Sequence, residues 1–131
     1  PWPYAPLLRN TTGHPIAKNL DFISASFPQS IDTIATPGIK KQILLSTSDY
    51  ARNLQTPALV EWRSIKTEQD LQLFNKQQLP IAVLLEGKFG SAFSNRLSKD
   101  EMELLSATGT PFMSTSVSDN SMVVISDGDL E

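Results

Sequence analysis

The residues best suited to bind a ligand or a partner follow an unbroken apolar run, Ile-Ala-Val-Leu-Leu, at residues 81–85. The positions after this run combine an acid, a base and two glycines, and glycines let backbone amides approach a ligand closely. The candidate binding residues of this loop are Glu86, Gly87, Lys88, Phe89 and Arg96. The same composition also suits a flexible loop that only connects two elements, and the sequence leaves both interpretations open.

Phe89 and Phe93 lie four residues apart in the same loop. If the loop were helical, the two rings would lie together and form an exposed pair for a partner protein. Packing of both rings in the core is the alternative use.

Two carboxylates, Asp127 and Asp129, complete the candidate set. They flank Gly128 directly after another apolar run, at residues 121–126. Paired carboxylates can hold Mg²⁺ or Ca²⁺, but no third ligand follows at the spacing of a calcium-binding loop. An Asp-Gly turn is the competing interpretation, and we expect no metal site here.

Other catalytic and cofactor chemistry finds no support in the sequence. His14 is the only histidine, cysteine is absent, and no serine lies in a Gly-x-Ser-x-Gly pattern. Neither a phosphate-binding loop ending in Gly-Lys-Ser/Thr nor a Gly-x-Gly-x-x-Gly turn occurs. We therefore expect no catalytic residues, no cofactor and no enzyme activity. Because the net charge is −3 and the basic residues are scattered, we do not expect nucleic acid or an anionic membrane as a partner.

The candidate loop needs a strand to hold it, and residues 81–85 have the continuous apolar pattern of a strand buried on both faces. A strand of this kind must have other strands beside it and helices over each face. We therefore expect an α/β fold with three layers, in which helices cover the central apolar strands. Ligands of open α/β sheets bind at the carboxyl ends of the strands, which is where the candidate loop begins.

Local patterns predict the remaining elements. Strands are expected at residues 21–28, 31–34, 42–46, 58–65 and 121–126. Capping-box spacings predict one helix over residues 68–75 and another that begins at Ser98 and buries Met102 and Leu105. A short helical turn is expected within residues 14–20. The turn signal Thr36-Pro37-Gly38 indicates antiparallel pairing, whereas helical patterns between apolar strands indicate a parallel pair, so we predict a mixed sheet.

The chain has 131 residues, of which 40% are hydrophobic, and this is enough for one domain with its own core. We assign residues 1–129 to a single α/β domain that is part of a larger one. Leu130 and Glu131 have the appearance of an expression-tag remnant. No apolar run approaches the roughly 20 residues that a membrane-spanning helix needs.

Several short segments resemble, in the same order, the GldG family, the auxiliary component of the gliding-motility-associated ABC transporter. The first group is Ala82-Val-Leu-Leu-Glu-Gly-Lys-Phe89, Phe93-Ser-Asn-Arg96 and Val123-Val-Ile-Ser-Asp-Gly-Asp129. Upstream, His14-Pro-Ile-x-Lys-Asn-Leu20, Ser30-Ile-Asp32, Leu44-Leu-x-Thr-Ser48 and Phe74-Asn75 are similar to the same family. The resemblance covers nearly the whole chain.

This resemblance implies an extracytoplasmic (periplasmic) domain of an inner-membrane protein, which meets the membrane only through segments outside this chain. It also implies ABC permease and ATPase subunits as partners. Our first hypothesis is therefore a non-enzymatic accessory module that binds a partner in an ABC transport system associated with gliding motility. The alternatives are an extracytoplasmic domain that binds a small molecule or cargo beside the candidate loop, and a hydrolase that uses carboxylates and Mg²⁺. The sequence indicates no oligomeric state.

Overall fold

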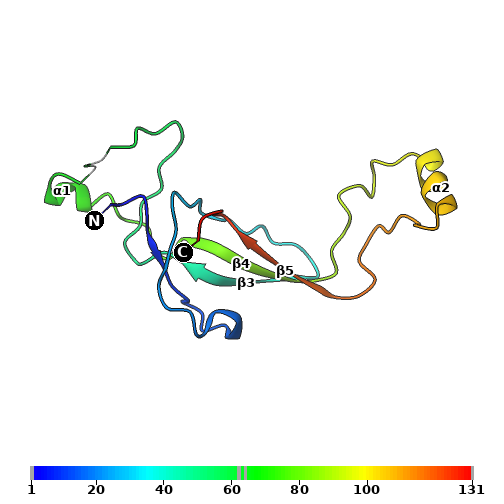
Figure 1. Cartoon of the computed structure of the whole chain (residues 1–131), viewed down its shortest axis with the longest axis horizontal. Helices are drawn as coiled ribbons and strands as arrows, with labels where there is room; N and C mark the ends of the chain where they lie inside the picture. Colours follow the sequence, from blue (N-terminus) through cyan, green and yellow to red (C-terminus); the bar gives the residue numbers. More distant parts are fainter. Residues whose placement is uncertain (1, 62, 64, 131) are drawn as a thin grey trace. The chain divides into compact units, whose positions relative to one another are not determined.

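A computed structural model of the chain describes residues 2–61, 63 and 65–130 (Figure 1). Two sheets are formed, a two-stranded one with the order β1-β2 and a three-stranded one with the order β3-β4-β5. In chain order the elements are β1 (Leu7–Leu8), the short 3-10 helix η1 (Pro15–Ala17), β2 (Ile23–Ser24), β3 (Ile39–Ser46), α1 (Glu68–Leu71), β4 (Pro80–Gly87), α2 (Lys99–Ala107) and β5 (Asn120–Ile125).

The central strand β4 confirms the prediction made from the apolar run at residues 81–85. Each of the residues Ile81, Ala82, Val83 and Leu84 is at most 2% exposed. Because successive side chains of a strand point to opposite faces, this burial means that both faces of β4 are covered. Leu44 and Leu45 of β3 and Leu8 of β1 belong to the same buried cluster as three of these β4 residues. The core is therefore built around β4.

Both sheets are antiparallel, so the predicted parallel pair is a point that the structure corrects. The connection from β3 to β4 begins and ends at one place, because the Thr47 N–H donates to the Leu79 carbonyl over 3.0 Å. The connection from β4 to β5 closes in the same way, where the Ser116 N–H donates to the Phe89 carbonyl over 2.9 Å. A parallel pair needs a connection that crosses to the other end of the sheet, and neither connection does so.

The helices are small, and they lie within these two connections. Both capping boxes form as predicted, Thr67 with Asp70 at α1 and Ser98 with Glu101 at α2. No residue of α1 or α2 is buried, and on the predicted inner face of α2 the side chains of Met102 and Leu105 are only half-buried. The expected helical layers over both faces of the sheet are therefore not confirmed, and the fold is mostly sheet.

Helix α1 ends at Leu71, four residues earlier than predicted. The next N–H groups donate to carbonyls three residues back, from Leu73 to Asp70 over 3.2 Å and from Phe74 to Leu71 over 3.1 Å. Bonds of this spacing form tight turns and do not extend an α-helix. The capping box thus predicted correctly where α1 begins, but it gave no information about the length of the helix.

Three strand predictions also need correction. Residues 31–34 form no strand, and neither do residues 58–61, 63 and 65, while residues 62 and 64 lie outside the described part of the chain. The predicted strand at 21–28 shrinks to β2, although its pairing continues through the Phe27 N–H, which donates to the Tyr4 carbonyl over 2.9 Å. Phe27 has a φ of 54°, a left-handed conformation that interrupts the regular period-two geometry.

The predicted turn at Thr36-Pro37-Gly38 is confirmed. The Ile39 N–H donates to the Thr36 carbonyl over 3.3 Å, and Gly38 has a φ of 76°. Proline followed by a residue with positive φ is the signature of a type II turn. This turn leads directly into β3.

Two compact units can be recognised in the chain. The first contains the described residues of Pro1–Ile34, Lys41–Leu84 and Val123–Glu131, and the second contains Ala35–Lys40 and Leu85–Met122. The single domain over residues 1–129 stays a prediction. Leu130 packs against the buried cluster of the first unit. None of the helices in the described residues has the length and apolar character needed to cross a membrane.

Candidate functional site

The first candidate residues, Glu86 and Gly87, are the last two residues of β4 and belong to the second unit. The Glu86 carboxylate lies 3.7 Å from the ammonium group of Lys40, which is on β3. Gly87 has a φ of 139°, and a Cβ atom at this position would lie 2.1 Å from the carbonyl oxygen of Gly38. Only glycine therefore fits here, because the backbone of the turn before β3 comes so close.

A surface hollow of about 630 Å³ opens at this place within the second unit. Its walls combine an ammonium group, two carboxylates, an amide and a hydroxyl with backbone of the turn. The lining residues are Gly38, Ile39, Lys40, Glu86, Gly87, Asp119, Asn120 and Ser121. The volume lies in the range of small-molecule sites, which is about 300–1,000 Å³. This arrangement can hydrogen-bond a polar ligand or a polar surface of a partner.

Sequence reasoning found two of these lining residues and missed Lys40, Asp119 and Asn120. The direction in which β3 and β5 run relative to β4 would have identified these residues. In antiparallel pairing the first residues of β3 and of β5 lie beside the last residues of β4. A correct prediction of antiparallel neighbours would have placed Lys40 and Asp119 next to Glu86.

The rest of the candidate loop is more regular than the sequence suggested. The Phe89 N–H donates to Ser116 Oγ over 3.0 Å, and Gly90 forms an antiparallel bridge with Thr115. The chain is therefore extended at Phe89 and Gly90, whereas Phe93 lies in a turn in which the Arg96 N–H donates to the Phe93 carbonyl over 3.0 Å, so Phe89 and Phe93 do not share a helical face. Phe89 is half-buried and Phe93 is exposed. Lys88 and Arg96 are exposed as well, and both belong to the second unit.

Asp127 and Asp129 belong to the first unit, whereas Glu86 belongs to the second. Ser126 pairs with Ile81 at the beginning of β4, through an N–H to carbonyl bond of 3.0 Å, whereas Glu86 and Gly87 are at the end of that strand. Asp127 Oδ2 accepts the Ser26 N–H over 2.8 Å, and its Oδ1 accepts the Asp129 N–H over 2.9 Å. Both oxygens of the Asp127 carboxylate thus bind backbone, as in an Asx turn.

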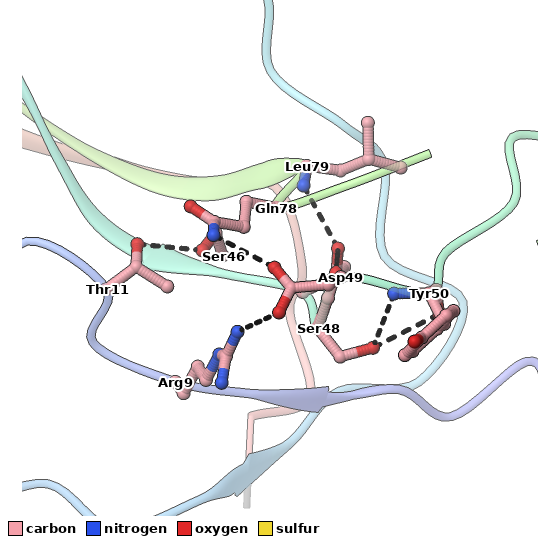
Figure 2. A network of polar contacts seen from close by, with 9 residues as sticks. Arg9, Thr11, Ser46, Ser48, Asp49, Tyr50, Gln78 and Leu79 are labelled. Carbon is pink, nitrogen blue, oxygen red and sulfur yellow. Dashed lines mark hydrogen bonds and ion pairs between the residues drawn. The ribbon is translucent and has the colours of Figure 1, made fainter. Parts of the chain in front are cut away.

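A polar network that the sequence analysis did not predict lies where β3 ends and β4 begins (Figure 2). The guanidinium of Arg9 donates to Asp49 Oδ2 over 2.9 Å, and the side-chain amide of Gln78 donates to Asp49 Oδ1 over 2.9 Å. The hydrogen bond from Gln78, followed by the one from Arg9, lowers the pKa of Asp49 below its ordinary value. The carboxylate therefore fastens three separate segments to one another.

The same network extends along the backbone. Thr47 Oγ1 accepts the Leu79 N–H over 3.0 Å, and Thr11 and Ser46 share a hydroxyl–hydroxyl bond of 3.0 Å. Figure 2 shows Arg9 and Gln78 pointing toward Asp49 from different segments. Nothing in the local sequence Thr47-Ser48-Asp49 shows that Arg9 and Gln78 lie beside it.

A second hollow, of about 460 Å³, lies within the first unit and is lined mainly by apolar side chains. Tyr50 and Leu71 form part of it and are exposed, and Ile65 and Phe74 are half-buried. Within residues 2–61, 63 and 65–130, no group of three or more His, Cys, Asp or Glu is placed to hold a metal ion.

Comparison with known proteins identifies the chain at the level of a family. A family model described as "ABC-type uncharacterized transport system" matches residues 1–131. The chain belongs to this family. It is thus an auxiliary component of an ABC-type transport system. None of the curated proteins and none of the solved structures that were compared with the chain matches it.

For this auxiliary transport component, the family match indicates a non-enzymatic role in association with an ABC transport system. The polar hollow beside Glu86 belongs to the second unit, as do the exposed cations Lys88 and Arg96. The network around Asp49 holds the chain connections together and is assigned a structural role.

Proposed function

We propose that this auxiliary component is a non-enzymatic module that binds partner subunits of an ABC transport system associated with gliding motility. The observation that carries the proposal is the family match over residues 1–131. The segments that are similar to the GldG family, and that occur in the same order as in that family, support the association with gliding motility. In this proposal the module works on the extracytoplasmic side of the inner membrane, tethered by segments outside this chain, and its partners are the permease and the ATPase.

The candidate loop is the part of the second unit that we assign to partner contact. Lys88 and Arg96 are exposed cations on either side of exposed Phe93. An exposed apolar side chain with charged neighbours is typical of a protein-binding surface, in which the charges steer the encounter and fix the register. Glu86 contributes through the polar hollow that it shares with Lys40.

The test is affinity purification of the full-length, membrane-anchored protein from its native host. We expect the permease and the ATPase to be recovered with it in fixed proportion. The double charge reversal Lys88→Glu, Arg96→Glu should reduce this recovery. Lys18→Glu is the matched control, because Lys18 is an exposed cation of the first unit outside the candidate loop. Failure of the wild-type protein to recover both subunits, in a preparation that preserves other transporters, would refute the proposal.

The hollow of about 630 Å³ favours a second candidate function, the binding of a small molecule or cargo. A ligand that binds only the folded protein stabilises it by RT ln(1 + [L]/Kd), which is about 1.4 kcal/mol at a free concentration of ten times Kd. A thermal-shift screen with polar small molecules tests this. Asp119→Asn should weaken any shift caused by a cationic ligand, whereas Asp129→Asn, outside the hollow, should leave it unchanged.

A further inference from the structure

Strand β5 of the three-stranded sheet leaves its apolar side chains exposed to an unusual degree. All six residues of Asn120–Ile125 are exposed. The exposed fractions are 49% for Met122, 46% for Val123, 38% for Val124 and 45% for Ile125. Because successive side chains point to opposite faces of a sheet, these four residues leave both faces of β5 open. In the central strand β4, by contrast, the apolar residues Ile81 to Leu84 are buried.

The outer edge of β5 is open to pairing along Asn120–Ile125, whereas the carbonyl of the next residue, Ser126, already accepts the Gln29 N–H over 3.2 Å. In the described part of the chain the sheet has the order β3-β4-β5, so β4 is the one strand that pairs with β5. An edge strand presents a row of N–H and C=O groups that another extended segment can pair with, and proteins usually block it with lysine, proline or a covering segment. Neither lysine nor proline occurs in Asn-Ser-Met-Val-Val-Ile.

The charges around β5 indicate what kind of strand fits. Asp119 precedes the strand, and Asp127 and Asp129 follow it. Residues 100–131 contain seven Asp and Glu and no Lys or Arg, although the whole chain has a net charge of only −3. A partner segment with a basic residue at each end would therefore be attracted to the carboxylate before β5 and to those after it, of which Asp127 already accepts the Ser26 and Asp129 N–H groups.

The same charges disfavour a second copy of this chain as the occupant. Two β5 strands that pair antiparallel about a twofold axis at Val123 would place Asp119 of one copy opposite Asp127 of the other, and the reverse. Like charges directly opposite each other across strands are destabilising. An apolar partner segment with basic ends avoids this repulsion and covers Met122 to Ile125.

We propose that the outer edge of β5 accepts, as an added strand, an extended apolar segment of a partner protein that carries Lys or Arg at both ends. This inference rests on the proposed partner binding and names the surface and the chemistry of the partner segment. Backbone bonds along the edge supply the attachment, the apolar residues fill the open faces, and the carboxylates select the charge at the ends.

The direct test uses the chain and a fluorescent peptide, Lys-Thr-Val-Ile-Val-Thr-Lys, in an anisotropy titration at low salt. We expect saturable binding that weakens with added salt. The same peptide with Glu at both ends should bind at least about fourfold more weakly, because exposed charge pairs contribute about 1.4-fold to 5-fold each, and reversing two pairs removes two attractions and adds two repulsions. Asp119→Asn should weaken binding of the lysine peptide about threefold. Equal binding of the two peptides would overturn the charge argument.

Two further comparisons test whether the edge itself is the site. A peptide with alternate N-methyl groups cannot pair through its backbone, so it should not bind; if it binds as well as the parent peptide, strand addition is wrong. Val124→Lys places a cation on the edge and should abolish peptide binding. Leu104→Lys is the matched control, because Leu104 is an exposed apolar residue of α2, and this variant should bind normally. If Val124→Lys unfolds, the N-methyl peptide still tests whether the peptide binds by pairing through its backbone.

Purification of the full-length protein separates this inference from the proposed function. If the permease and the ATPase accompany the wild type but not Val124→Lys, the proposed function and the inference about the β5 edge both stand. If they accompany both proteins equally, the inference about the β5 edge is wrong and the proposed function stands. If they accompany neither, the proposed function fails, and the peptide titration alone decides the β5 surface. A dimer of the chain that Val124→Lys dissolves would show that a second copy occupies the edge, and would overturn the inference.

Discussion

Gly87→Ala tests the close approach on which the geometry of the candidate site depends. The alanine Cβ would lie 2.1 Å from the carbonyl oxygen of Gly38 and 3.2 Å from Ile39 Cδ1. The first of these atoms belongs to the backbone, so no side-chain rotation can relieve the overlap. The substitution therefore forces β4 and the turn before β3 apart at the polar hollow.

The expected loss of stability has two parts. A φ of 139° at Gly87 is a conformation that side chains rarely adopt, and holding alanine there costs about 1–3 kcal/mol. The backbone shift that removes the overlap costs about another 1–3 kcal/mol. The free energy of unfolding should therefore fall by about 2–6 kcal/mol, which is a large part of the roughly 5–15 kcal/mol that stabilises a domain.

Urea denaturation followed by circular dichroism measures this loss, and two other glycines calibrate it. Gly90→Ala meets no atom within 4 Å and should change the free energy of unfolding by less than about 0.5 kcal/mol. Gly13→Ala also meets no atom, but Gly13 has a φ of 68°, so the cost should be about 1 kcal/mol from backbone strain alone. If Gly87→Ala costs no more than Gly13→Ala, the reasoning about the contact with Gly38 is wrong.

Three further predictions concern the network, the helix α2 and the core. The pKa of the Asp49 carboxyl is lowered by the hydrogen bond from Gln78 first, so its contribution to stability is complete above the ordinary value of 3.8 and is lost as the pH falls through the lowered pKa. Asp49→Asn should therefore unfold at a melting temperature that falls less between pH 5 and pH 2 than that of the wild type; equal slopes would contradict this. Ser98→Ala removes the hydroxyl that accepts the Glu101 N–H and should destabilise α2 by about 0.5–2 kcal/mol, seen as faster amide exchange confined to that helix. Val83→Asp buries an unpaired charge at a position that is 1% exposed and should unfold the protein, whereas a soluble variant with an unchanged melting curve would refute the central position of β4.

The parts of the fold that the sequence predicted well are those that neighbouring residues determine. The apolar run from Ile81 to Leu84 needs cover on both faces wherever it lies, so β4 could be recognised without knowledge of its partners. The capping boxes at Thr67 and Ser98 involve residues three positions apart, and both form. In each case the interaction that fixes the structure lies within a few residues of sequence.

The parts that the sequence did not predict depend on residues far apart in the chain. The direction of β4 relative to β3 is fixed by contacts such as the one between Thr47 and Leu79, which are 32 residues apart. The network at Asp49 needs Arg9, 40 positions earlier, and Gln78, 29 positions later. A helical pattern between two apolar runs predicts a crossover connection, but a connection that returns to its starting point has the same local pattern.

Strand direction also decides which residues form the candidate site. With parallel strands, Glu86 and Asp127 would leave the sheet at one edge and could act together on a metal ion or a ligand. With antiparallel pairing, Glu86 has two other charged neighbours in the polar hollow, Lys40 and Asp119. The Asp127 carboxylate binds two backbone N–H groups, from Ser26 and Asp129. Variants at Lys40 and Asp119 therefore belong beside those at Lys88 and Arg96 in any test of how this component meets its transporter.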